Sequence, residues 1–267
     1  MIKRKILNAI EKITGVKIYR IPKNRGCYQP SSKNKWPPSL ESAFLGILTQ
    51  KGMLKIIQLG ANEGKVNDPL YSFVTRHSEK TSILLVEPQE GVAKALQENY
   101  KAHPCYQISV SAVGNGNDVT FYSVKPEYWE KLNVPYARDW PPGRAATGVC
   151  SSHKQHVIEW LKKYLDTDKY SPEDAINAYT YKTVTFSELL ARYPTFCDPD
   201  VLQIDIEGAD DVAVLSALDD DLRPAVINFE SKHLPEDKLA VCLWALEVRG
   251  YSCFLGDQDT LCLKINT

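Results

Sequence analysis

Acidic side chains gather at the end of one apolar segment, LQIDIEGADD, which starts at Leu202. Asp205 and Glu207 stand where a strand buried on both faces would end. Side chains two residues apart on a strand point to the same side, and charges at the mouth of a buried sheet are costly unless they have partners or a function. Because open α/β sheets bind ligands at this edge, we interpret Asp205 and Glu207 as a ligand site. Asp210 and Asp211 follow at an expected helix N-terminus, where negative charge is favourable in any protein.

A second group of chemically active residues follows another apolar run. Residues 225–230 indicate a buried strand, with Glu230 at its end and His233 three residues later. A histidine near carboxylates is suited to general base catalysis, and His153 and His156 from mid-chain are further candidates. The structural alternatives are a strand-end histidine that satisfies a backbone group, for His233, and a helix-surface residue, for His156.

Four of these residues also form a candidate metal site, because hard oxygen ligands suit Mg²⁺ or Ca²⁺. The sequence leaves open whether this group binds a divalent metal, orients a substrate or moves a proton. The candidate ligands are Asp205, Glu207, Glu230 and His233.

A glycine-bearing loop, GANEG at residues 60–64, follows the apolar residues 54–59 and is a candidate nucleotide cradle. Glu87 ends the next apolar run, where a carboxylate can hold both hydroxyls of a ribose. A dinucleotide site would show Gly-x-Gly-x-x-Gly, and Glu63 would set a negative charge beside its phosphates. S-adenosylmethionine, which has no phosphate, therefore fits better than a nicotinamide cofactor, and a nicotinamide-dependent oxidoreductase is the alternative.

The elements that must position these residues alternate as in a doubly wound α/β domain. We expect this domain over residues 53–267, after an N-terminal helical extension over residues 1–52. Residues 251–255 and 261–265 should form a terminal antiparallel hairpin, because their link is short.

The α/β alternation is interrupted over residues 125–181, which we interpret as a functional insertion or lid. Within it only residues 153–165 have a helical pattern, and just before it residues 106–113 and 119–124 should form a hairpin-like return. Aromatic residues of the insertion either stack on a sugar ring or pack in a core. They are Tyr128, Trp129, Tyr136 and Trp140.

Bulk properties restrict the partners and the compartment. The chain has 267 residues and a net charge of −1, so no overall attraction to nucleic acid is expected, and no apolar run is long enough for a transmembrane helix. Seven scattered cysteines without a C-x-x-C pair suggest a reducing compartment, which we take to be the cytoplasm. The basic N-terminal residues lack a secretory pattern, and Ile2, Ile6, Ile10 and Ile13 would share one helix face. Such a helix would either pack on the domain or rest on an anionic membrane surface.

Several segments together resemble the FkbM family of S-adenosylmethionine-dependent methyltransferases. They are IIQLGANEG, LLVEPQ, ISVSAVG, LQIDIEGAD, NFESKHL and the late DTL, and they extend over residues 55–264. The stretch TGVCSSHKQHV is similar to a segment of one branch of the family. The resemblance implies a class I methyltransferase fold, a seven-stranded sheet whose last strand is antiparallel, and O-methylation of sugars or polyketide-type metabolites.

The resemblance also implies roles for individual residues. The methionine end of the cofactor should lie against Gly60, Ala61, Asn62 and Gly64, the ribose against Glu87, and the adenine near Ser111 and Ala112. Asp205 and Glu207 should face the transfer site, and Pro88 and Asp205 are also counted among the cofactor residues. The family usually has an aspartate where this chain has Gln58, which we count among the cofactor residues. An amide removes a charge that could pair with the cofactor's ammonium, so a silent binding module is a further alternative.

Overall fold

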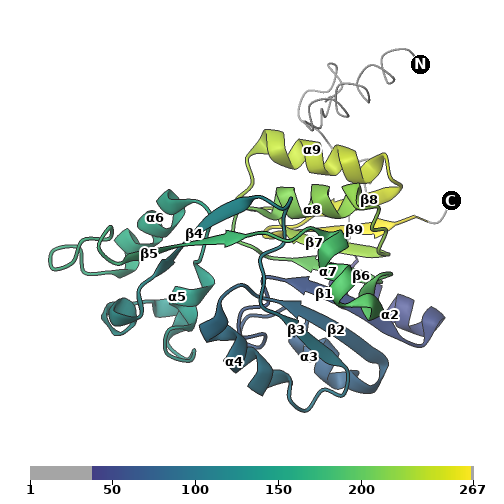
Figure 1. Ribbon diagram of the computed structural model, residues 1–267, viewed down its shortest axis with the longest axis horizontal. Coiled ribbons are helices and arrows are strands. Elements are labelled where there is room, and N and C mark those ends of the chain that lie inside the picture. The colour runs from purple at the N-terminus through teal and green to yellow at the C-terminus, as the bar shows by residue number, and fades with distance from the viewer. Residues whose placement is uncertain (1–37, 266–267) are drawn as a thin grey trace.

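A seven-stranded sheet forms the centre of the computed structural model, which describes residues 38–265 (Figure 1). Its strand order is β3-β2-β1-β6-β7-β9-β8, and every pairing from β3 to β7 is parallel. The strands are β1 (Leu54–Leu59), β2 (Thr81–Val86), β3 (Tyr106–Ser109), β6 (Val201–Ile204), β7 (Val226–Glu230), β8 (Tyr251–Leu255) and β9 (Asp259–Lys264).

The last strand reverses direction, which confirms the predicted terminal hairpin. β9 pairs antiparallel with both β7 and β8. The short link between β8 and β9 forces this reversal, because a parallel connection needs a long crossover. A parallel sheet with helices on both faces and an antiparallel final strand is the fold class that the sequence predicted.

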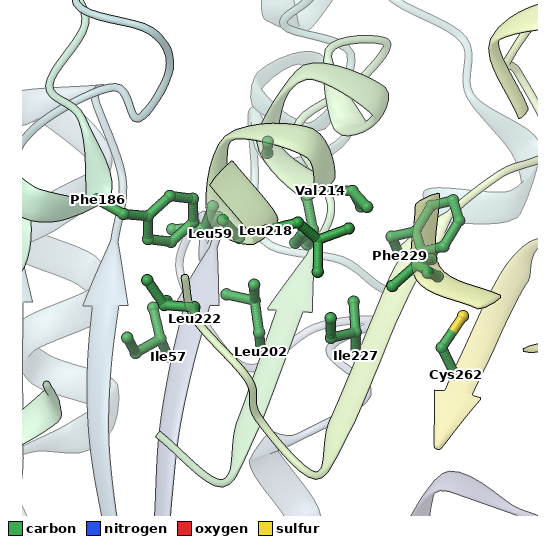
Figure 2. Close-up of a cluster of buried hydrophobic side chains, with 14 of the residues drawn as sticks. Ile57, Leu59, Phe186, Leu202, Val214, Leu218, Leu222, Ile227, Phe229 and Cys262 are labelled. Atoms are coloured by element: carbon green, nitrogen blue, oxygen red, sulfur yellow. The ribbon is translucent and has the colours of Figure 1, made fainter. Parts of the chain in front are cut away.

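Helices cover both faces of the sheet, which explains why its central strands are mostly apolar on both sides. Ile57 and Leu59 of β1 pack with residues of α7, α8 and α9, whereas Leu54 and Ile56 pack on the other face with residues of α2, α3 and α4. Figure 2 shows the first of these clusters, where α8 rests on the strands. The helices are α2 (Leu40–Lys51), α3 (Tyr71–Arg76), α4 (Glu90–Tyr100), α7 (Phe186–Arg192), α8 (Asp210–Asp219) and α9 (Glu236–Glu247).

The mid-chain segment builds a small unit of its own, on the left in Figure 1. β4 (Asp118–Val124) pairs antiparallel with β5 (Ile176–Lys182), and α5 (Arg144–Gly148) and α6 (Lys154–Tyr164) pack beside them around a separate apolar cluster. The helix expected over residues 153–165 is confirmed as α6, while α5 and β5 were not predicted. The hairpin-like return was wrong: β3 ends at Ser109, and β4 pairs with β5 instead. Cross-strand contacts support this pairing, since the Thr120 and Thr180 hydroxyls are 3.1 Å apart and the rings of Phe121 and Tyr181 meet edge to face.

Part of the N-terminal extension is visible as α2, whose N-cap Ser39 accepts a hydrogen bond from the Ser42 backbone N–H. The basic helix that the sequence predicts before it lies outside the described residues. Within residues 38–265, the helices are too short and too polar to cross a membrane.

Replacing Leu202 with alanine should destabilise the protein strongly. Leu202 is fully buried in β6 among the residues of the central sheet. Because a leucine-to-alanine change in a packed core leaves a cavity, the free energy of unfolding should fall by about 2–5 kcal/mol in urea denaturation. Leu45→Ala is the matched control, since Leu45 is 41% exposed on α2, and it should change stability by no more than about 0.5 kcal/mol. Equal urea midpoints for the two variants would contradict this assignment of the core.

Candidate functional site

A pocket of about 520 Å³ opens where the parallel strands end. The adjacent strands β3, β2, β1, β6 and β7 each deliver residues to it, which is why segments far apart in sequence meet there. Most of the residues singled out from the sequence line this pocket. They are Gly60, Asn62, Glu87, Pro88, Ser111, Ala112, His156, Asp205, Glu207, Glu230 and His233.

Gly60 has a conformation and a position that only glycine fits. Its φ is +75°, and a Cβ at this residue would lie 1.7 Å from the backbone oxygen of Asp205. The backbone N–H groups of Gly60 and Ala61 both donate to the Val86 carbonyl, at 3.0 and 3.1 Å. The loop is thereby fixed between the ends of β2 and β6.

Glu87 is buried but keeps hydrogen-bonding capacity toward the pocket. Its Oε2 accepts the Asn62 N–H and its Oε1 accepts the Gln89 N–H, both at 2.9 Å. Each carboxylate oxygen has a second lone pair, so two neighbouring hydroxyls of a ribose can be bound at once. Burial raises the pKa of Glu87, and these two backbone hydrogen bonds oppose the shift.

Three residues expected at the cofactor lie behind the pocket wall, so their cofactor role stays a prediction. Ala61 is buried, and a Cβ on Gly64 would lie 2.5 Å from Leu96 of α4. Gln58 is also buried; its Nε2 donates to Asp68 Oδ2 at 2.6 Å, and its Oε1 has no hydrogen-bond partner within residues 38–265. A carboxylate therefore adjoins the position where the family usually carries one, but it comes from Asp68.

Carboxylates and histidines face each other at the other end of the pocket. His156 Nε2 lies 3.8 Å from Glu207 Oε2, and His233 Nε2 lies 3.8 Å from Glu230 Oε1. The two imidazole rings meet edge to face with centroids 5.4 Å apart. Thus α6 of the mid-chain segment and the chain after β7 bring together two acid–histidine pairs.

Desolvation shifts the pKa of each of these groups toward its uncharged form: the pKa values of the acids are raised and those of the histidines are lowered. Asp205 keeps accessible surface toward the pocket, but the walls displace most of the surrounding water; this desolvation, with Asp210 nearby, raises the Asp205 pKa to about 7. Desolvation and the charge of Asp205 raise the pKa of Glu230 to about 7 and that of Glu207 well above its usual value. Desolvation also lowers the pKa of His156 and of His233, so both imidazoles are neutral near pH 7.

The metal interpretation gains no support from this geometry. Among residues 38–265, no three histidine, cysteine, aspartate or glutamate side chains are grouped so that they could hold a metal ion. Asp210 lies in the first turn of α8, as the sequence predicts, and it also accepts the backbone N–H groups of Ile206 and Gly208, which fixes the turn after β6.

The mid-chain segment contributes a wall that the sequence did not identify in full. Tyr136 and Trp140 line the pocket as expected for stacking residues, whereas Tyr128 and Trp129 pack in the small core of the segment. Trp160 of α6 lines the pocket as well and donates from Nε1 to the Tyr136 hydroxyl at 3.1 Å. Other unpredicted wall residues are Arg144, Thr147, Lys163, Tyr164 and Lys232.

The sheet order and the antiparallel last strand, with a glycine loop after β1 and an acid after β2, define a class I methyltransferase fold. The chain belongs to the FkbM methyltransferase family, because the model of the methyltransferase FkbM domain matches residues 58–253. The family's cofactor is S-adenosylmethionine, and membership supports a methyltransferase over the oxidoreductase alternative.

Among curated proteins no match was found. Solved structures show only distant likeness. A precorrin-6y C5,15-methyltransferase from Geobacter metallireducens is 11% identical, with 87% of this chain and 92% of that chain covered and a TM-score of 0.37. A putative caffeoyl-CoA O-methyltransferase from Staphylococcus aureus is 9% identical, with 98% and 91% covered and a TM-score of 0.39.

The raised pKa of the pocket acids predicts that stability falls as the pH rises through about 7. A carboxyl with a higher pKa in the folded state than in the unfolded chain stabilises the fold while protonated, and this contribution is lost above the folded pKa. Glu230→Gln should therefore reduce the decrease in unfolding temperature between about pH 5 and 7.5, by about 2–4 °C for each 1 kcal/mol that the protonated carboxyl contributes. Differential scanning fluorimetry measures it, with Glu127→Gln as a control at an exposed carboxylate. An unchanged pH dependence in Glu230→Gln would contradict the prediction.

Proposed function

We propose that this protein is an S-adenosylmethionine-dependent O-methyltransferase that acts on a hydroxyl of a sugar, a glycan or a related secondary metabolite. The observation that carries the proposal is that one pocket holds both kinds of group. Glu87, a carboxylate suited to bind a ribose, lies at one end of this pocket, and two acid–histidine pairs lie at the other. Such a pocket has a place for an adenosine cofactor and, beside it, groups that can accept a proton.

The residues present fit the cofactor. The loop at Gly60 gives its backbone close access to the pocket, and Glu87 presents two oxygens for the ribose hydroxyls. Ser111 and Ala112, after β3, lie on the far side of Glu87 from the loop in strand order, where the adenine would be held. The carboxylates at the ends of β6 and β7 suit a cofactor that carries a sulfonium and an ammonium.

When bound, S-adenosylmethionine supplies a methyl group that is already activated for transfer to oxygen. The protein must hold the acceptor hydroxyl in line with that group, and positioning of this kind can contribute on the order of 7–11 kcal/mol. It must also accept the hydroxyl proton. We assign Asp205 and Glu207 to orienting the acceptor molecule, because both line the pocket.

His233 is the group to which we assign the proton. It follows β7, and the chain before it is fixed because the Ser231 and Lys232 N–H groups both donate to the Gln258 carbonyl at 2.9 Å. A base held on a rigid element keeps its orientation, and the lowered pKa of His233 leaves the imidazole free to take a proton near neutral pH. His156, whose ring meets that of His233 edge to face, is the alternative base.

The aromatic wall supports a ring-shaped acceptor. Tyr136, Trp140, Trp160 and Tyr164 line the pocket on the side of the acid–histidine pairs, and their rings contact one another edge to face or tilted. Aromatic rings pack against the C–H faces of a sugar, while the hydroxyls at the edge of the sugar stay hydrated.

Cys242 and Cys262 are buried thiols, which accords with a reducing compartment, and we propose the cytoplasm.

Calorimetry with S-adenosylmethionine tests the cofactor, and Glu87→Gln tests the site. A hydrogen bond to a charged group contributes about 1.5–3 kcal/mol, so Glu87→Gln should weaken binding by about 10- to 100-fold. Glu90→Gln, an exposed acid at the start of α4, is the matched control and should bind as the wild type does. Absence of binding to the folded wild-type protein would refute the proposal, and an oxygen-linked methyl in a product from a panel of hydroxyl acceptors would exclude a silent binding module.

Substituting His233 should reduce turnover without reducing cofactor affinity. Loss of a general base costs about 10²–10⁴-fold, so His233→Asn should lower kcat by that range while the Kd for S-adenosylmethionine stays unchanged. The pH–rate profile separates the candidates: with histidine as the base, activity of the wild type should persist below the usual histidine pKa, whereas with Asp205 or Glu230 it should fall through about pH 7. A full loss in His156→Asn and none in His233→Asn would move the assignment to His156.

A further inference from the structure

Arg144 is a buried cation attached to the cofactor loop from outside the central domain. Its side chain is 12% exposed and lines the pocket. Its Nε donates to Glu63 Oε1 at 3.2 Å and its Nη2 donates to the Val66 carbonyl at 3.0 Å, both in the loop that follows β1. The residue begins α5, so the mid-chain segment and the cofactor loop are joined through this guanidinium.

The guanidinium still has donors to offer. It carries five N–H groups, and no residue in 38–265 accepts a hydrogen bond from Nη1. Nη1 lies where a Cβ on Gly148 would be 2.6 Å away, so the glycine leaves room for it. The ion pair with Glu63 thus orients the guanidinium and leaves the N–H groups of Nη1 available to a ligand.

Charges along the pocket assign this cation to one end. The other lysine or arginine residues that line the described pocket are Lys163 and Lys232, and both act on His233, at the acid–histidine end. The charge of Arg144 also acts on Glu87, Asp205 and Glu207, but its hydrogen bonds go to Glu63 and Val66, beside Asn62. It is therefore the cation of the pocket at the cofactor loop.

The order of the strand ends determines which part of the cofactor lies there. Ser111 follows β3, Glu87 follows β2 and Gly60 follows β1, so a cofactor with its ribose at Glu87 and its adenine near Ser111 extends its amino acid portion past Gly60. That portion ends in a carboxylate, an anion that must enter a pocket rich in acids. We propose that Arg144 binds the carboxylate of S-adenosylmethionine through its free guanidinium N–H groups. This inference rests on the proposed cofactor.

The test compares two ligands that differ only in the carboxylate: S-adenosylmethionine and its decarboxylated form. Arg144→Gln should weaken S-adenosylmethionine by about 10- to 100-fold in calorimetry and leave the affinity for the decarboxylated compound within about twofold, because only the first has the anion that a charged hydrogen bond serves. Arg144→Lys, which keeps the charge beside Glu63 but loses the fork, should show the same selectivity to a smaller degree. Arg138→Gln, an exposed arginine of the same segment, is the control for the chemical change.

The possible outcomes are distinct. Equal weakening of both ligands in Arg144→Gln would overturn the inference and assign Arg144 to holding the loop through Glu63, and no weakening of either would overturn it too. A wild-type protein that binds neither ligand would refute the cofactor itself. Thermal unfolding of each variant shows whether it is folded, and where Arg144→Gln is not, the ligand selectivity of Arg144→Lys decides.

Discussion

The close approach of two strand ends is the constraint on which the site depends. The Asp205 N–H donates to the Leu59 carbonyl at 3.1 Å, and the Asp205 carbonyl occupies the place of a Cβ on Gly60. A side chain at residue 60 would separate β1 from β6 and the cofactor loop from the acids. Because both strands are buried on both faces, neither can shift to relieve the clash. The packing of the core therefore requires glycine at residue 60, where the pocket begins.

Electrostatics gives this geometry its selectivity. The pocket brings Asp205, Glu207 and Glu230 together where little water surrounds them, so their charged forms are unfavourable. The pKa of each is raised for this reason. A ligand with positive charge on sulfur and nitrogen reduces that cost by entering, whereas a phosphate would increase it. The same surroundings lower the pKa of His233, so the shifts of the acids and of the histidine have one cause, desolvation.

Local patterns were sufficient for the sheet and the strand-end residues, since strand periodicity and the glycine turn are encoded within a few residues. Arg144 and the pairing of Gln58 with Asp68 were out of reach, because each depends on which segments meet in space. The pairing of β4 with β5 joins residues about sixty apart, and the segment between them has a regular period only over residues 153–165. Trp160 lies within the helical pattern of residues 153–165, which is compatible with a core residue and with a pocket residue. Only the position of α6 in the fold shows that it lines the pocket.

The mid-chain segment also governs one of the acids. Glu207 has a φ of +53°, in the left-handed region that a side chain disfavours, and the Ser151 hydroxyl donates to its carbonyl at 2.6 Å. A conformation of this kind persists only where its surroundings fix it, and here the fixing group comes from the segment that also carries the aromatic wall. The segment therefore sets both the shape of the acceptor end and the direction of Glu207, while Glu87 and Gly60 depend on the sheet. Because Arg144 and Thr147 of the same segment also hydrogen-bond Glu63 and Asn62, the segment is tied to both ends of the pocket.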